Sequence, residues 1–365
     1  MTTPEELLDA VQEGDLARIQ ALLDAGADPN PSWDEAQARA DHRGFLIDMD
    51  EWDDALSEEE NFAAAAQHGF TLKRNPWGHD IPLCCAAQAG DVALINALLD
   101  AGAELNVRDE QEQTALWYAT TREALEALVA RGLDLEDRNT YEWTPLVTAI
   151  VEGSPDRVRL LLAVGADPHA THDKGFTAFM SAVSSSERSL EVIQALLDAG
   201  ADPLAQTDLG YNALHAAIDV NGEANAEPSV RQTLSRLVEL GVDLEHRNSR
   251  GDTPLTRALL FGTPTEVQVL LELGADPHVT AAKGSPMGPP GSSTLSISLG
   301  WPENVKLLLD AGVEPNRVEP GGQTALDKAR LMLADAREEV DEESDWSVEW
   351  VQRLERTIAL LETAS

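Results

Sequence analysis

The sequence predicts an all-α solenoid, a stack of helix-turn-helix units with short finger loops. The phrase ALLDAGADP occupies Ala195–Pro203, and the identical nine residues occupy Ala21–Pro29. Looser copies of it place glycines at 26, 102, 132, 165, 200, 241, 274 and 312, with spacings of 76, 30, 33, 35, 41, 33 and 38. A recurrence of roughly 33 residues is typical of a stacked repeat array, which grows by addition and can remain one domain.

Each of these glycines follows a predicted amphipathic helix. Ile193, Leu196 and Leu197 recur at i, i+3 and i+4, which places them on one buried stripe. Gly200, three residues later, can adopt the left-handed conformation that ends a helix. Each period therefore closes with a second helix and a glycine stop.

A second phrase, Thr-Pro-Leu or a variant of it, starts the first helix of each period. It begins at Ile81, Thr114, Thr144, Thr177, Asn212, Thr253 and Thr324. A threonine at the N-cap accepts a hydrogen bond from an unpaired N–H, and proline loses nothing at the first helical position. One period thus holds a turn, a first helix, a short link, a second helix and the glycine.

With both phrases in place, the chain resembles the ankyrin-repeat family, whose pattern runs G-x-T-P-L-H-x-A-A and then a helix ending L-L-x-x-G-A-D. The resemblance covers nearly the whole chain except about 45 residues near the N-terminus. Only His215 occupies the family's histidine position. Elsewhere that position holds Cys84, Trp117, Val147, Met180, Thr256, Ser296 or Asp327. We expect those units to lose a local polar contact, which makes the array less regular.

We predict a single array over residues 1–365, with eight or nine units. Its expected parts are an N-terminal capping repeat at 1–30, an insertion or degenerate repeat at 31–76, central repeats at 77–319 and C-terminal capping helices at 320–365. Insertions in repeat proteins map to one face, often the binding face. A packed loop without a binding role is an equal alternative for 31–76.

The charge of the chain limits its partners. With 26 Lys and Arg against 65 Asp and Glu, the formal net charge is −39. Nucleic-acid affinity depends largely on Lys and Arg that neutralise phosphates, so we expect no nucleic-acid partner. The acidity either steers a basic protein towards the chain or only serves solubility on solvated helix faces.

The sequence favours a cytoplasmic monomer. Met1–Glu6 lacks the basic start and apolar run of a signal peptide, and no apolar stretch is long enough to cross a bilayer, so no membrane is expected. Cys84 and Cys85 are adjacent on a predicted helix and do not face each other, which favours small core residues over a disulfide.

No pattern of catalytic residues stands out, so we expect neither an enzyme nor a cofactor or metal. His169 and His172 have a spacing that could hold a metal ion. However, His169 and His278 share a repeat position that holds asparagine in other units, and no third ligand lies near in the sequence. Carboxylates are so abundant that solvated faces explain nearly all of them.

The resemblance implies that finger turns and outward first-helix positions form a concave surface that binds proteins. Carried over to this chain, the finger positions are Trp77, Tyr141, Trp143, Phe176 and Tyr211, and the first-helix positions are Glu152, Asp219, Phe261 and Trp301. Trp143, Phe176 and Tyr211 precede the capping residue in successive repeats, which predicts a ladder with rungs roughly 10 Å apart. Tyr and Trp are enriched where interfaces bind most strongly. The alternative is that these rings pack on each other and only stiffen the fingers.

The sequence therefore predicts a protein–protein interaction module or scaffold that binds its partner on a concave acidic-aromatic face. An acidic inhibitor or antitoxin-like protein that neutralises a basic partner is one alternative. An enzyme with its site in the 31–76 insertion is an alternative of another class.

Overall fold

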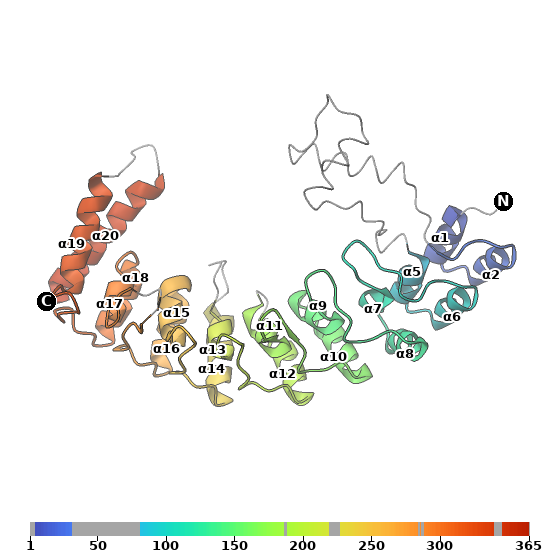
Figure 1. Cartoon of the computed structure of the whole chain (residues 1–365), viewed down its shortest axis with the longest axis horizontal. Helices are drawn as coiled ribbons and strands as arrows, with labels where there is room; N and C mark the ends of the chain where they lie inside the picture. The colour runs from blue at the N-terminus through green and yellow to red at the C-terminus, as the bar shows by residue number, and fades with distance from the viewer. Residues whose placement is uncertain are drawn as a thin grey trace, which may run out of the picture. The chain divides into compact units, whose positions relative to one another are not determined.

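The computed structural model describes residues 4–30, 81–185, 188–218, 227–283, 285, 288–338 and 345–364. Over these ranges the chain is mostly helical, and the predicted all-α repeat architecture is confirmed (Figure 1). The chain forms two compact units, residues 1–148 with 159–167 and residues 149–158 with 168–365. The whole of the predicted insertion, residues 31–76, lies outside the described residues.

The first unit begins with helical hairpins. Their helices are α1 (Pro4–Glu13), α2 (Leu16–Asp24), α5 (Pro82–Ala89), α6 (Val92–Asp100), α7 (Ala115–Tyr118) and α8 (Arg122–Arg131). Helix α1 packs on α5 and α5 on α7, while α2 packs on α6 and α6 on α8. First helices thus stack on first helices and second helices on second helices. The next hairpin, α9 (Pro145–Val151) and α10 (Pro155–Val164), contains the division between the units.

The second unit repeats this arrangement. Its helices are α11 (Ala178–Ser184), α12 (Leu190–Asp198), α13 (Ala213–Ala216), α14 (Glu227–Glu239), α15 (Pro254–Phe261), α16 (Pro264–Glu272), α17 (Thr294–Ile297), α18 (Pro302–Asp310), α19 (Ala325–Glu338) and α20 (Asp345–Ala364). The first helices α11, α13, α15, α17 and α19 pack in series, as do α14, α16, α18 and α20. One finger adds a short antiparallel pair, β1 (Thr171–His172) with β2 (Phe176–Thr177), which the sequence did not predict.

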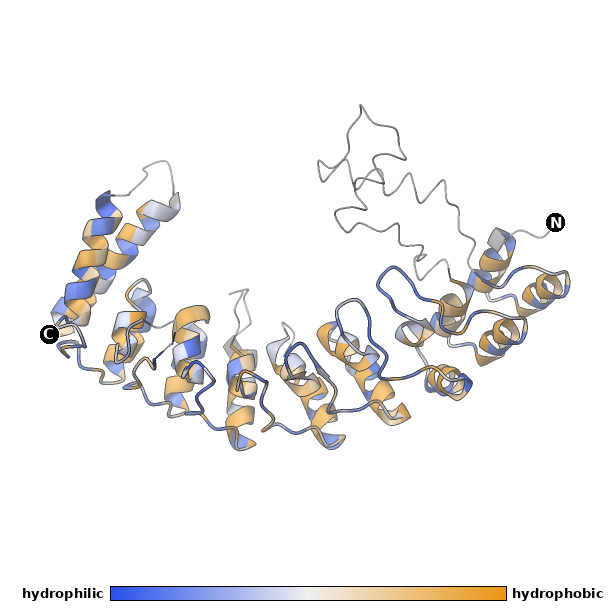
Figure 2. Cartoon of the chain, viewed as in Figure 1, coloured by the Kyte–Doolittle hydropathy of each residue, from blue (hydrophilic) through white to orange (hydrophobic). Residues whose placement is uncertain are grey.

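The core of each hairpin is the apolar stripe that the sequence predicts. Ile193 and Leu196 of α12 are buried, as are Val267 and Leu270 of α16. Figure 2 shows the apolar residues on the helices and the hydrophilic ones concentrated in the loops. Since a single hairpin cannot hide such a stripe, burial against the neighbouring hairpin supplies the stability of each unit.

The polar contact at the start of the first helix does not depend on histidine. In α15 the Thr256 Oγ1 accepts a hydrogen bond from the Thr253 N–H at 2.7 Å, and in α19 the Asp327 Oδ2 accepts one from the Thr324 N–H at 3.0 Å. For the Thr256 and Asp327 units the expected loss of the contact is therefore wrong, because a threonine or aspartate oxygen accepts from the same N–H. Cys84, Trp117, Val147 and Met180 carry no side-chain oxygen that could do so.

Four described carboxylates depart from the expectation of solvated faces, because Asp109, Asp252, Glu266 and Glu319 are all buried. Glu266 and the Arg188 guanidinium form an ion pair at 3.0 Å with side chains 1% and 0% exposed, and Arg188 also donates to the Ala217 carbonyl at 2.8 Å. This link joins the three repeats that contain α12, α13 and α16. A pair so far inside the stack has no solvent to compete with it.

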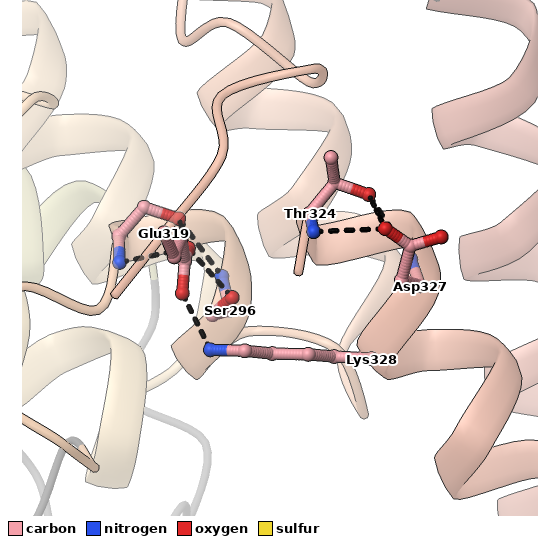
Figure 3. Close-up of polar contacts among 6 residues, drawn as sticks. Ser296, Glu319, Thr324, Asp327 and Lys328 are labelled. Carbon is pink, nitrogen blue, oxygen red and sulfur yellow. Dashed lines mark hydrogen bonds and ion pairs between the residues drawn. The ribbon is translucent and has the colours of Figure 1, made fainter. Parts of the chain in front are cut away.

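Another of these buried carboxylates is Glu319, in the finger before α19. It accepts hydrogen bonds from the Ser296 hydroxyl at 2.7 Å and from the Lys328 ammonium at 2.5 Å (Figure 3), as well as from Ser293. Burial alone would raise the pKa of the Glu319 carboxyl, but these donors outweigh it and hold the pKa below its usual range. The charged carboxylate therefore ties α17 to α19.

Candidate protein-binding surface

In two fingers an asparagine side chain accepts hydrogen bonds from the backbone N–H groups two and four residues further on. In the finger before α9, the Asn139 Oδ1 accepts the N–H groups of Tyr141 at 3.0 Å and Trp143 at 3.1 Å. In the finger before α15, Asn248 does the same for Arg250 at 2.9 Å and Asp252 at 3.0 Å. These turns fix which side chains project from each finger.

Backbone hydrogen bonds join three pairs of neighbouring fingers within the units. Thr140 donates to the Gln111 carbonyl at 3.0 Å in the first unit. In the second unit Asp208 donates to Lys174 and Ser249 to Leu209, both at 2.9 Å. The fingers therefore present their side chains at fixed intervals.

Tyr141 and Trp143 form an aromatic pair at the tip of one finger of the first unit. Their ring centroids are 5.2 Å apart with an interplanar angle of 34°, and Tyr141 is 59% exposed. The two rings pack on each other, and Tyr141 still leaves an aromatic face open to solvent. Glu142, between them, is also exposed.

Phe176 in the second unit is half-buried on β2, and its ring lies 5.3 Å from that of His172 on the paired strand. The His172 Nε2 in turn lies 2.8 Å from the Ser181 hydroxyl. His172 is thus part of the finger's packing. Among the described residues no group of three or more His, Cys, Asp and Glu is placed to hold a metal ion.

Tyr211 and Phe261 are brought together by a residue that the sequence analysis missed. The Arg257 guanidinium lies over both rings, 5.2 Å from the Tyr211 centroid and 5.7 Å from the Phe261 centroid. Its Nε donates to the His215 carbonyl at 2.9 Å. The signal in the sequence was the spacing of Arg257 and Phe261, one helical turn apart, which puts them on one face of α15.

The buried His215 packs against Tyr211, a member of this group. It is fully buried, its Nε2 lies 2.9 Å from the Asp252 carbonyl, and its ring lies 5.4 Å from that of Tyr211. Burial lowers the pKa of His215 to about 4. The neutral imidazole therefore acts as a structural link between two repeats.

Trp301 does not belong to a first helix, so that assignment was wrong. It is the N-cap residue of α18, a second helix, because Pro302 occupies the first helical position. The Trp301 ring is 42% exposed and the Arg353 guanidinium lies 4.6 Å from its centroid. It therefore lies against the C-terminal helix α20.

The remaining predicted residues do not join these groups. Glu152 is exposed directly after α9. Trp77 and Asp219 lie outside the described residues. Within the described ranges, no helix combines the length and the apolar composition that spanning a membrane requires.

Stacked hairpins with fingers at one end of their first helices define a class of repeat protein. The family model described as "Ankyrin repeats (3 copies)" matches residues 83–172, 122–207 and 179–281, which together span more than half of the chain. The chain belongs to the ankyrin-repeat family, as its sequence resemblance predicted. Ankyrin repeats are generally protein–protein interaction modules.

Individual relatives match parts of the chain. It is 35% identical over 106 residues to ankyrin repeat protein nuc-2 of Neurospora crassa, covering 28% of this chain and 10% of that protein. It is 43% identical over 53 residues to protein phosphatase 1 regulatory subunit 27 of Homo sapiens, covering 14% of this chain and 34% of that protein. The matched regions are thus a tenth to a third of these relatives. The solved ankyrin repeat domain of human ASB11 is 20% identical and covers 74% of this chain and 97% of its own, with a TM-score of 0.45.

Proposed function

We propose that the chain binds a protein partner through the tips of its fingers and the adjoining ends of its first helices. The observation that carries this proposal is the set of partly exposed aromatic side chains at those places. Tyr141 is 59% exposed and Phe261 is 41% exposed, and both are held by contacts within the repeats. Ordered aromatic rings bind with little loss of conformational entropy.

The partner in this proposal is basic over most of the surface that it presents. A formal charge of −39 gives a strong negative field around the chain, which steers a positively charged protein and speeds its association. Such a partner also fits a scaffold or an inhibitor, and the two differ in whether the bound protein loses its activity. No catalysis is proposed.

The test is substitution of finger residues. Replacing Trp143, Phe176 and Tyr211 with alanine should lower partner affinity at least a hundredfold, because aromatic hot spots contribute about 2 kcal/mol or more each. The partner is first isolated from the native cell and identified by mass spectrometry, and affinity is then measured by calorimetry. Circular dichroism should show unchanged helical content.

The matched control is Trp346→Ala. Trp346 is 71% exposed but lies on α20, away from the fingers in sequence and stacked on Trp350 at 6.0 Å. It should bind like the wild type. Unaltered affinity of the finger variant, or an equal loss in the control, would contradict the proposal.

A further inference from the structure

A pocket of about 200 Å³ lies beside the Arg257 guanidinium in the second unit. It is lined by Tyr211, Asn248, Arg250, Asp252, Arg257 and Phe261. The lining comes from two neighbouring fingers and helix α15. The volume is below the roughly 300–1,000 Å³ of small-molecule sites, so it suits one side chain of a bound protein.

Arg257 is held in place before any partner arrives. Its Nε donates to the His215 carbonyl at 2.9 Å, and its guanidinium lies over the Tyr211 and Phe261 rings. Arginine stays charged in proteins and presents several N–H groups in a planar fork. Because these contacts already order the side chain, a further partner loses less entropy on binding it.

The Asp252 and Glu266 carboxylates act electrostatically on Arg257, but neither forms an ion pair with it. Neither Arg257 nor Arg250 forms an ion pair with any described residue, although acidic residues outnumber basic ones by 65 to 26. Other arginines do have such partners, for example Arg108 with Asp137 at 2.8 Å. Asp252, which also lines the pocket, is 4% exposed and accepts a hydrogen bond from the Ser285 hydroxyl at 2.5 Å.

We infer that this pocket, the Arg257 pocket, receives an aspartate or glutamate side chain of the bound protein. The inference rests on the proposed function and names one group that the partner carries. A carboxylate matches the guanidinium fork and makes charge-assisted hydrogen bonds with it, and Arg250 and the Tyr211 hydroxyl add donors at the rim.

The Arg257 pocket gives specificity to an otherwise acidic surface. A basic partner is attracted in many registers, since the negative field does not distinguish among them. One acidic residue on that partner is repelled over most of this acidic surface but is attracted at the Arg257 pocket. The acidic residue therefore favours the binding register in which its carboxylate meets Arg257.

The test selects peptides from a random library on the immobilised full chain. Peptides that bind the wild type should be rich in Lys and Arg and should share one aligned position that holds Asp or Glu. Changing that residue to Asn or Gln should weaken binding to the wild type about tenfold or more, the range of a buried charge-assisted contact. The same change should alter binding less than about twofold for the variant Arg250→Gln/Arg257→Gln.

Three further variants of the chain serve as comparisons in this test. Arg250→Gln alone, at an exposed position, should reduce the effect of the acidic residue if the double variant fails to fold. Arg257→Lys keeps the charge without the planar fork and should give an intermediate effect. Arg236→Gln, on α14 outside the Arg257 pocket, should behave as the wild type.

Binding peptides without a shared acidic position, or an acidic position whose effect is the same in the Arg250 and Arg257 variants, would overturn this inference and leave the proposed function standing. Failure to select any peptide would count against both.

Discussion

The finger turn imposes one backbone requirement that different residues meet. In these fingers, the residue two places before the N-cap residue of the following first helix has a positive φ. This φ is 70° at Gly210 and 80° at Gly251 and Gly322. Glu112 and Glu142 adopt the same conformation at 61° and 60°, although they carry a Cβ. The family pattern places glycine here, because a side chain in this region costs roughly 1–2 kcal/mol. The turn itself is therefore strong enough to hold strained residues in two fingers.

Two glycine substitutions separate strain from steric clash. Both Gly251 and Gly322 have a φ of 80°, but a Cβ at 251 would lie 2.2 Å from the Ala282 Cβ, whereas a Cβ at 322 meets nothing within 4 Å. We expect Gly322→Ala to lose about 1 kcal/mol of stability from backbone strain and Gly251→Ala to lose clearly more. Urea unfolding measures both, and equal losses would contradict the clash.

The buried His215 makes stability depend on pH. Its pKa in the folded chain is about 4, below the roughly 6.5 of an unfolded histidine. The unfolded state therefore binds the extra proton between these values, so stability is lost as pH falls from about 6.5 to about 4. The loss is up to roughly 3 kcal/mol for this group. Above pH 6.5 the imidazole is neutral in both states and its contribution is complete.

The measurement compares pH profiles of thermal unfolding. His215→Asn should flatten the acid limb relative to the wild type, while His278→Gln, at an exposed position, should leave the profile unchanged. A wild-type acid limb retained in the His215 variant would show that another group is responsible.

Helical elements pair as their apolar periodicity predicts, but two features depend on contacts that periodicity does not encode. Arg188 and Glu266 are 78 residues apart, and nothing local marks either residue as buried. Trp301 lies beyond the first helix because α17 is short, covering only Thr294–Ile297, and the apolar pattern does not mark the end of so short a helix. The same limit holds at the Arg257 pocket, where the aromatic residues were predicted and the arginine between them was not.

The Arg188–Glu266 pair should hold together the three repeats that contain α12, α13 and α16. Glu266→Gln leaves the Arg188 guanidinium buried without its counter-ion and should destabilise the second unit by about 3–5 kcal/mol. The matched exposed pair, Arg330 with Glu362 at 2.6 Å, should lose less than about 1 kcal/mol in Glu362→Gln. Urea titration followed by circular dichroism measures both variants, and a small loss at Glu266 would contradict the structural role of the pair.

For the whole molecule, the two repeated phrases were enough to predict the class of fold, the ankyrin family and the order of hairpins. They predict the positions of the fingers, and hence a surface, because finger and helix positions follow from the repeat register. They do not predict which finger residues are exposed, since Tyr141 and Trp143 partly cover each other. The insertion or degenerate repeat at 31–76 stays a prediction.

The net charge predicts opposite effects of salt on the free chain and on its complex. Raising the salt concentration shortens the screening length from about 30 Å at 0.01 M to about 10 Å at 0.1 M. Self-repulsion of the −39 chain should then weaken and its melting temperature rise, while association with a basic partner should slow. Calorimetry and stopped-flow mixing measure the two effects, and salt-independent association would contradict a basic partner.

Hydrogen exchange of the chain, measured with and without its identified partner, locates the binding surface. The partner should slow exchange in the fingers at 139–143, 173–177, 207–211 and 248–252 and at the adjoining first helices. Protection confined to the second helices α8, α12, α14 and α16 would contradict the proposed binding surface.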